Sequence, residues 1–443
     1  MTADTGLFAH TATQLARLIH EGAVSPSEVA AAALARIDAL DGRVRAWVEI
    51  DRVAVAAEAA LLDREARTGS FRGPLHGVPI GIKDIYDVAG LPTRANATFL
   101  AGVAPAAGDA EPVAALRRAG ALILGKTATT TFAMGDPAAT VNPWNATHTP
   151  AGSSSGSAAA VAAAMVPAAL GTQTAGSILR PASFCGVVGL KPSFGRVSRD
   201  GVIPFAWSLD TMGPLTRSVA DAALLLEALT HPGWRPAPDA DRAGMPPRLG
   251  FVPRLFPERL HAEMAAMLDR AAAALAGAGA RVDEAKLPEG FDLTLEAHHI
   301  VMTVEGAAFH SRTYPRHLHE YPPRLRTLVE SGCLIPATAY LDAQRVRAEL
   351  RERTLPLFDR FDALLVPAAA GPAPEGLGFT GDPSFNAPWT MFGLPAIALP
   401  GGRDAQGLPL GLQLVGRPRA DEALLRVAGW CEDVLGPAEL PPL

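Results

Sequence analysis

The 443-residue chain has little charge and no basic block. Charged residues make up 19% of it, and the formal net charge is −6. A protein that binds nucleic acid needs clusters of Lys and Arg to contact the phosphates, so we expect no nucleic-acid partner. With 49% hydrophobic residues, the composition is typical of a compact globular protein and not of a disordered chain.

Long apolar runs are also missing. The richest one, "AAAVAAAMVPAALG" at 158–171, consists mostly of alanine, is interrupted by Pro167 and is too short to cross a bilayer. The N-terminus has no basic region followed by an apolar one, so we predict no secretory signal. We therefore expect a soluble, cytoplasmic protein with no membrane partner.

Metal ligands in a recognisable pattern are absent too. The three cysteines are too few and too scattered for a disulfide framework or a zinc cluster, and we expect them to be small buried hydrophobes. Five histidines gather in one region, but no pair has the HExxH spacing, so we predict no metal site. The residues concerned are Cys185, Cys333, Cys431, His298, His299, His310, His317 and His319.

Lysine is the scarcest cation: of 39 Lys and Arg residues only four are lysines, Lys83, Lys126, Lys191 and Lys286. A position that must release its proton cannot be arginine, so these lysines are candidate functional residues. Lys83 follows the apolar run "VPIGI", where burial would lower its pKa toward that of a usable base. On position alone, an ion pair with the adjacent Asp84 is the simpler interpretation.

Strand and helix patterns alternate along the chain. The stretch "SPSEVAAAALARIDAL" opens with Ser25 as N-cap, and Glu28 completes a capping box. Short apolar runs bounded by Gly and Pro predict buried strands; they lie within 75–88, 120–125, 248–253, 362–368, 395–402 and 409–418. This pattern predicts an α/β fold with a large mixed β-sheet covered by helices on both faces.

We predict one domain over residues 1–443, with a helical N-terminal part at 1–70. The Pro- and Gly-rich stretch 231–247 could link two domains, but strands on both sides of it could equally enter one sheet. We favour a surface loop at 231–247, followed by the rest of the sheet and helices at 248–443.

Two segments fit the formula of a known motif but lack the structural context that the motif requires. The segment "GALILGKT" at 120–127 fits the phosphate-loop formula, but its middle residues look like the strand itself and not like a loop. The segment "GSSSG" at 152–156 fits the nucleophile-elbow formula around Ser154, but no strand precedes it. Neither ATP hydrolysis nor an α/β-hydrolase is expected.

Three longer segments carry a more specific pattern. "GIKDIYDVAGLPTRA", "PAGSSSGSAAAVAAAMVPAALGTQTAGSILRPASFCGVVGLKPS" and "SLDTMGPLTRSVAD" resemble the amidase signature family in order and spacing. The resemblance is dense over a signature core at 73–225 and thinner from 360 to 418. It implies a single amidase domain, no cofactor and no metal.

The resemblance also implies catalytic residues. Lys83, Ser153 and Ser177 occupy the positions of a Ser-cisSer-Lys triad, in which the lysine draws the proton of the nucleophile Ser177 through the hydroxyl of Ser153. An oxyanion hole would consist of the backbone N–H groups of Thr174, Ala175, Gly176 and Ser177. The expected reaction is attack on an amide carbonyl, an acyl-enzyme and hydrolysis by water.

The chain departs from many family members beside Ser177. They carry Asp, Gly and Arg where this chain has Gln173, Ala175 and Leu179, and we expect the joint loss of the Asp and Arg charges to be compensated. Arg180, three residues past Ser177, has two interpretations: it braces the loop, or it holds a carboxylate of the substrate. We expect the pocket wall to come from 129–136, including Met134 and Gly135, and from 385–393.

The sequence thus predicts an amidohydrolase that cleaves the C–N bond of a small amide, with a carboxylate-bearing amide such as a dicarboxylic acid monoamide as one substrate class. The first alternative is the glutamine-hydrolysing subunit of a tRNA-dependent amidotransferase, which needs partner subunits. The second is a non-catalytic binding member. The expected partner is a small-molecule amide, and a homodimer is left open.

Overall fold

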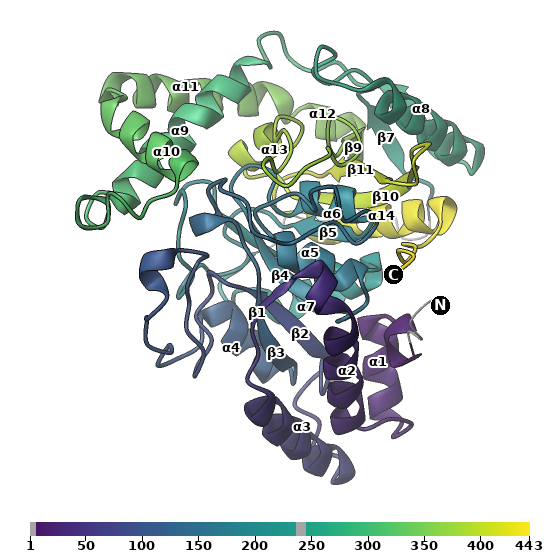
Figure 1. The fold of residues 1–443 in the computed structure, drawn as a ribbon. Coiled ribbons are helices and arrows are strands. Elements are labelled where there is room, and N and C mark those ends of the chain that lie inside the picture. Colours follow the sequence, from purple (N-terminus) through teal and green to yellow (C-terminus); the bar gives the residue numbers. More distant parts are fainter. Residues whose placement is uncertain (1–5, 236–244) are drawn as a thin grey trace.

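The computed structural model describes residues 6–235 and 245–443, and eleven strands of these residues form one mixed sheet in the order β1-β3-β2-β4-β6-β5-β10-β11-β9-β7-β8 (Figure 1). The strands are β1 (Trp47–Glu49), β2 (Pro79–Lys83), β3 (Leu122–Thr127), β4 (Ala168–Gln173), β5 (Val188–Lys191), β6 (Thr211–Thr216), β7 (Arg248–Phe251), β8 (Arg281–Glu284), β9 (Ala363–Pro367), β10 (Ala396–Arg403) and β11 (Pro409–Val415). The predicted strands are confirmed.

The helices lie between strands along the chain, except that the first two precede β1 and the last follows β11. They are α1 (Ala12–His20), α2 (Pro26–Val44), α3 (Arg52–Arg67), α4 (Glu111–Arg118), α5 (Ser155–Ala162), α6 (Leu179–Cys185), α7 (Val219–Leu229), α8 (Ala262–Gly277), α9 (Leu293–His310), α10 (Pro323–Leu334), α11 (Ala337–Thr354), α12 (Leu357–Arg360), α13 (Ala387–Met391) and α14 (Asp421–Leu435). Across the described residues, none of them combines the length and the apolar composition that crossing a membrane requires.

Helices cover both faces of the sheet, as predicted. On one face α5 and α6 pack against each other and against β4 and β10. On the other, α7 packs on β6 and contacts α14, which in turn contacts α8 and β10. Strands such as β2 and β4 are therefore buried along their whole length. The chain is a single α/β domain built on a large mixed sheet.

In the N-terminal part, one predicted feature is confirmed and one strand was not predicted. Helix α2 begins after Ser25, and the Ser25–Glu28 capping box forms with both hydrogen bonds. The part at 1–70 contains the helices α1, α2 and α3, but residues 47–49 also form the edge strand β1, antiparallel to β3, which was not predicted. Three residues are too few to show an alternating pattern, so nothing in the sequence indicated this strand.

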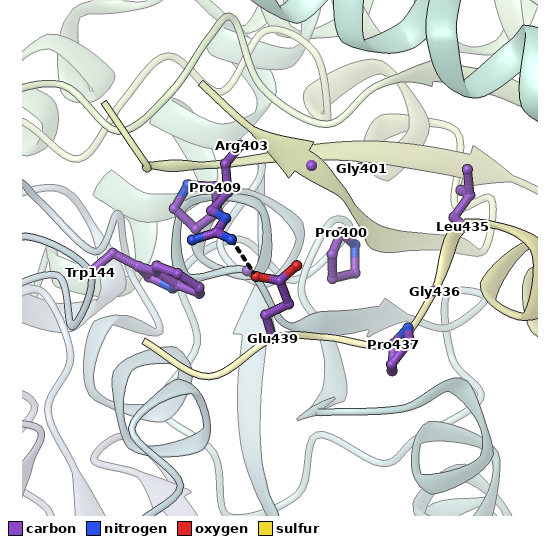
Figure 2. Close-up of a pocket in the computed structure, with 11 residues that line it drawn as sticks. Trp144, Pro400, Gly401, Arg403, Pro409, Leu435, Gly436, Pro437 and Glu439 are labelled. Carbon is purple, nitrogen blue, oxygen red and sulfur yellow. Dashed lines mark ion pairs between the residues drawn. The ribbon is translucent and has the colours of Figure 1, made fainter. Parts of the chain in front are cut away.

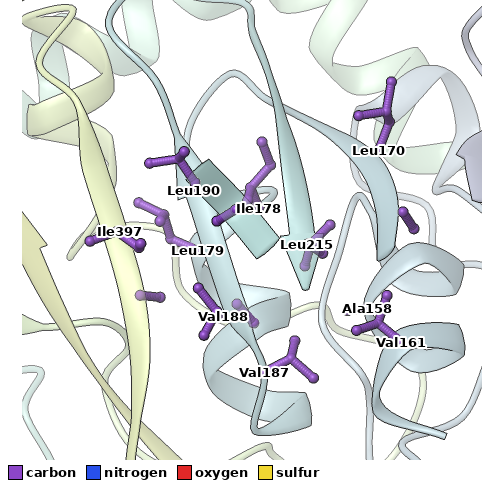
Figure 3. Packing of buried hydrophobic residues seen from close by; sticks show 14 of the residues in the cluster. Ala158, Val161, Leu170, Ile178, Leu179, Val187, Val188, Leu190, Leu215 and Ile397 are labelled. Atoms are coloured by element: carbon purple, nitrogen blue, oxygen red, sulfur yellow. The ribbon is translucent and has the colours of Figure 1, made fainter. Parts of the chain in front are cut away.

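The core around the signature segment consists mainly of the aliphatic side chains of alanine, valine, isoleucine and leucine (Figure 3). Ala158 and Val161 belong to α5, which contacts both β4 and β6. Gly156 lets α5 approach very closely, since a Cβ there would lie 2.2 Å from the Ala46 carbonyl oxygen. The alanine-rich helix thus brings the Ser/Gly loop before it close against the sheet.

The remaining helices lie outside this core. Helices α9, α10 and α11 pack on one another beside the sheet, at the opposite end of the molecule from α3 (Figure 1). Helix α9 also contacts α13. The predicted surface loop 231–247 falls largely on residues 236–244, which lie outside the described residues.

Candidate active site

Lys83 is the last residue of β2 and is fully buried. Its Nζ lies 2.7 Å from Ser153 Oγ and 2.7 Å from Thr172 Oγ1. Because β2 and β4 are parallel neighbours, Lys83 and Thr172 lie at the same edge of the sheet. Burial lowers the pKa of Lys83 well below its usual value, and only the negative charge of Asp210 opposes this shift.

The competing interpretation of Lys83, an ion pair with Asp84, is wrong. Asp84 Oδ1 lies 2.9 Å from Lys126 Nζ, and both side chains are buried. Lys126 belongs to β3, so the phosphate-loop match at 120–127 is a strand, as expected. The second buried lysine therefore neutralises Asp84.

Ser153 lies in the loop before α5, and the Gly152–Ser153 peptide bond is cis. The Ser153 carbonyl accepts a hydrogen bond from the N–H of Thr130 at 3.3 Å. The next residue, Ser154, accepts from the N–H of Thr172 at 3.2 Å through its hydroxyl, so it ties the loop to the end of β4. Ser154 has this structural role, and no strand precedes it.

Ser177 lies between β4 and α6 and is 8% exposed. Its carbonyl accepts a hydrogen bond from the N–H of Ser154 at 3.3 Å, which places it beside the Ser153 loop. The Ser177 hydroxyl has no hydrogen-bond partner in the described parts of the chain. The transfer of its proton to Ser153 therefore stays a prediction.

Each of the four backbone carbonyl groups of segment 174–177 accepts a hydrogen bond. The carbonyls accept from His298 Nε2 at 2.9 Å, Thr390 Oγ1 at 2.8 Å, the N–H of Arg180 at 2.9 Å and the N–H of Ser154 at 3.3 Å, in the order Thr174, Ala175, Gly176 and Ser177. The N–H groups of Ala175, Gly176 and Ser177 donate to no acceptor within residues 6–235 and 245–443. Free N–H groups beside a serine are what an oxyanion hole requires.

Two acid–base groups from other parts of the chain hold Thr174. Asp210 Oδ1 accepts from the Thr174 hydroxyl at 2.6 Å, and burial raises the pKa of Asp210 to about 6. His298 of α9 donates to the Thr174 carbonyl, and burial lowers the pKa of His298 to about 4. His298 therefore stays neutral near pH 7 and keeps its proton on Nε2.

Arg180 is buried on the first turn of α6. Its Nε donates to the Thr380 carbonyl at 2.7 Å, and its Nη2 donates to the Gly152 carbonyl at 2.8 Å. These bonds brace the cis-serine loop, which is the first of the two predicted roles. Arg180 Nη1 is buried without a partner among the described residues, and burial lowers the pKa of Arg180 to about 10. A role in carboxylate binding stays a prediction.

The predicted pocket wall at 129–136 lies beside Ser153. Phe132 packs edge-on against His310 with the ring centroids 4.8 Å apart. The Asp136 carboxylate accepts from the N–H groups of Arg324 and Leu325 at the start of α10. The wall is thus joined to the helices beside the sheet. Contact of Met134 and Gly135 with substrate stays a prediction.

A separate cavity of about 100 Å³ lies between the β10–β11 hairpin and the C-terminal residues. Figure 2 shows Trp144, Arg403 and Glu439 on its wall, with the Arg403–Glu439 ion pair at 2.7 Å. None of the three predicted triad residues lines this cavity.

The prediction that all three cysteines are buried is confirmed for two of them. Cys185 and Cys431 are buried as expected, but Cys333 is exposed, because it lies on the outer side of α10. No group of three or more His, Cys, Asp or Glu side chains in the described residues could hold a metal ion. His298 has a role at the site that its position in a histidine-rich stretch did not indicate.

Sequence reasoning missed four residues around the site: Thr172, Asp210, His298 and Thr390. Thr172 and Asp210 lie within the segments that carry the family resemblance, so their location was a signal. His298 and Thr390 come from distant helices and contact the segment only in the folded chain. Thr390 lies within 385–393, which was predicted as pocket wall, but its bond to the Ala175 carbonyl was not predicted, and the neighbours of His298 in sequence give no indication of its role.

A buried lysine that contacts Ser153, with Ser177 in the segment that hydrogen-bonds to the Ser153 loop, is consistent with the arrangement that the sequence predicted for a serine-dependent amidase. The Amidase family model matches residues 28–425. The chain therefore belongs to the Amidase family and is an enzyme that acts on C–N bonds.

Named relatives agree on the family and differ in activity. The chain is 37% identical to a glutamyl-tRNA(Gln) amidotransferase subunit of Moorella thermoacetica, over 95% of this chain and 96% of that protein. It is 32% identical to the peptide amidase of Stenotrophomonas maltophilia, with a TM-score of 0.83 and 98% of each chain covered. It is 31% identical to a chain from a vestigial protein complex linked to the origins of an s-triazine catabolic enzyme, with a TM-score of 0.88, covering 97% of this chain and 100% of that one.

Proposed function

We propose that this protein hydrolyses the C–N bond of a small amide through an acyl-enzyme on Ser177. The observation that carries this proposal is the position of Lys83 Nζ, 2.7 Å from Ser153 Oγ in a buried site that lowers the pKa of the lysine. A neutral amine has a lone pair that can accept a proton, whereas an ammonium group cannot.

The chemistry then runs through two hydroxyl groups. Lys83 accepts the proton of Ser153 while Ser153 takes the proton of Ser177, and Ser177 Oγ bonds to the amide carbon. The negative charge on the carbonyl oxygen is stabilised by the free N–H groups of segment 174–177, each of which is worth about 3 to 4 kcal/mol at the transition state.

The proton returns by the same route to the leaving nitrogen. The C–N bond breaks, ammonia or an amine departs, and the acyl group stays on Ser177. Water then attacks this ester with the same relay as general base, which releases the acid and restores the Ser177 hydroxyl. Thr172 contributes the second polar contact of Lys83 Nζ, so that an N–H of the neutral amine has an acceptor.

We further propose that the substrate carries a carboxylate. Arg180 uses Nε and Nη2 on backbone carbonyls and has Nη1 left over, buried and without a partner in the described residues. Such a donor is costly to leave unsatisfied. A carboxylate would satisfy it, as expected for a dicarboxylic acid monoamide.

The curated relatives favour a second candidate, the glutamine-hydrolysing subunit of an amidotransferase. The chain matches the Moorella thermoacetica amidotransferase subunit over 95% of its length. Glutamine is itself a carboxylate-bearing amide, so the Arg180 argument holds for both candidates. They differ in whether partner subunits are required.

A fluorophosphonate probe tests the nucleophile. We expect it to label the wild-type protein and not Ser177→Ala, with Thr380→Ser as a labelled control. Failure to label the wild type, or equal labelling of Ser177→Ala, would contradict the proposed function and favour a non-catalytic binding protein.

Ammonia release tests the substrate. Succinamate, its neutral analogue succinamide, and glutamine are compared for the protein alone and for the protein purified with its native partners. Arg180→Ala should lose more kcat/KM on succinamate than on succinamide; equal losses would leave only the bracing role. Glutamine hydrolysis that appears only with co-purified subunits would establish the second candidate.

A further inference from the structure

Gln173 binds the segment around Ser177 from its C-terminal side. It ends β4 and is fully buried. Its side-chain Oε1 accepts hydrogen bonds from the N–H groups of Ile178 at 2.9 Å and Leu179 at 3.0 Å. These N–H groups at the start of α6 would otherwise have no acceptor within the helix. The Gln173 amide thus ties the two residues after Ser177 to the end of the strand.

The other end of the same amide reaches α13. Gln173 Nε2 donates to Thr390 Oγ1 at 2.9 Å, and Thr390 Oγ1 lies 2.8 Å from the Ala175 carbonyl oxygen. A hydroxyl can accept one hydrogen bond and donate its single proton in another. The Asn386 carbonyl also lies 3.3 Å from Thr390 Oγ1, but the bond to Ala175 is the shorter one and takes the proton. All members of this chain of bonds are buried.

The bond to Ala175 determines where a neighbouring N–H points. In a trans peptide the C=O of one residue and the N–H of the next lie in one plane and point in opposite directions. The carbonyl of Ala175 and the N–H of Gly176 share such a peptide. Thr390 belongs to α13, so the Ala175 carbonyl points toward α13 and the Gly176 N–H points away from it. This N–H has no acceptor in the described residues.

Gly176 is also packed closely, with no room for a side chain. A Cβ at this position would lie 2.4 Å from Asn386 Oδ1, in the residue that precedes α13. The start of α13 therefore packs directly on the Gly176 backbone, while Thr390 on the same helix binds the preceding carbonyl. One short helix restrains this peptide through packing and through a hydrogen bond.

We propose that Thr390, held by Gln173, is a positioning residue that orients the Gly176 N–H toward the oxyanion of the reaction. This inference rests on the proposed Ser177 chemistry. Thr390 acts through the Ala175–Gly176 peptide and does not touch the reacting atoms. Its effect is expected in the transition state, where the oxyanion forms, and not in ground-state binding.

The test compares Thr390→Val with Thr390→Ser. Valine keeps the shape of threonine but removes the hydroxyl, whereas serine keeps the hydroxyl. We expect Thr390→Val to lower kcat on succinamate by about 10- to 100-fold, with KM changed less than about twofold and with a similar loss in the rate of fluorophosphonate labelling. Thr390→Ser should keep kcat within about threefold of the wild type.

Gln173→Glu is the second variant, for the case that Thr390→Val does not fold. Glutamate keeps the acceptor for Ile178 and Leu179 but has no N–H, so the Thr390 proton turns to the carboxylate and leaves Ala175. It should show the same loss of kcat, and adding Thr390→Val to it should cost little more, because the two residues act as one unit.

The outcomes separate this inference from the proposed function. A wild-type protein that neither hydrolyses amides nor reacts with the probe would contradict the proposed function itself. An active wild type together with an active Thr390→Val, a loss confined to KM, or a Thr390→Ser as impaired as Thr390→Val would overturn the positioning role alone.

Discussion

Asp84 forms its ion pair with Lys126 on the neighbouring strand, 2.9 Å away, and not with Lys83, which precedes it in the chain. Successive side chains of a strand point to opposite faces, so Asp84 and Lys83 diverge as β2 ends. The lysine of the site is left with two hydroxyl groups as neighbours. Because Lys126 has a carboxylate partner and Lys83 has none among the described residues, Lys126 stays charged while Lys83 is neutral.

The ion pair predicts a specific pattern of stability. Lys126→Met should lower the free energy of unfolding by about 3 to 5 kcal/mol, because it leaves the Asp84 carboxylate buried without its partner. The double variant Lys126→Met/Asp84→Asn should recover much of this loss. Urea denaturation of the two single variants and the double variant measures the coupling, and additive effects would contradict the pair.

Lys83→Met should lower the activity but raise the stability of the protein. Its kcat/KM should fall by about 10³-fold or more, as expected for loss of a triad member. Its stability near pH 7 should rise, because methionine fills the site without the cost of burying an amine.

The pH dependence supplies the control for Lys83. Between its lowered folded pKa and about 10.5, the unfolded chain binds a proton at Lys83 and the folded protein does not. The stability of the wild type therefore rises with pH in this window, and Lys83→Met should lack that rise. Urea midpoints from pH 6 to pH 9 measure it, and parallel curves for the two proteins would show that Lys83 is charged when folded.

Thr172 offers a test of the second contact of Lys83. Thr172→Val keeps the shape but removes an acceptor for the amine, which should lower kcat/KM about tenfold or more. Thr172→Ser keeps the hydroxyl and is the matched control. If both variants retain wild-type activity on succinamate, the 2.7 Å contact between Lys83 and Thr172 has no role in the reaction.

The sequence was sufficient for features whose cause is local. The strand before Lys83 is a short apolar run bounded by glycine and proline, and the Ser25–Glu28 box needs only four residues. It was insufficient where a side chain spans the fold. Asp221 stands at capping distance from Ser218, yet its carboxylate accepts from Ala12 and Thr13 at the start of α1, about two hundred residues away in sequence.

The same reason explains the missed part of the site. The bond between Gln173 and Thr390 joins residues 217 apart, and although Thr390 lies within the predicted pocket wall at 385–393, nothing near it indicates a bond to Gln173. The scarcity of lysine made Lys83 a candidate, and the resemblance to the amidase signature family implied its role together with those of Ser153 and Ser177. Residues that hold the segment from behind are specified only by packing, which a single sequence does not reveal.

His298 makes the last prediction, which concerns stability at acidic pH. Burial lowers the pKa of His298 to about 4 from its ordinary value of 6.5. Between these values the unfolded chain holds a proton that the folded protein lacks, so stability rises with pH across the window and is lost as pH falls through it. A shift of this size corresponds to roughly 3 kcal/mol.

His298→Gln should remove this contribution and still offer an N–H to the Thr174 carbonyl, so its stability should change less between pH 4.5 and pH 6.5 than that of the wild type. His310, on the same helix, also has a pKa lowered to about 4 by burial, but it packs behind Phe132 of the predicted pocket wall and, within the described residues, has no hydrogen bond to segment 174–177. His310→Gln should therefore flatten the same stability curve without affecting kcat, whereas His298→Leu, which loses the bond to Thr174, should lower kcat. A His298→Leu variant with wild-type kcat would show that the imidazole only fills space behind the segment.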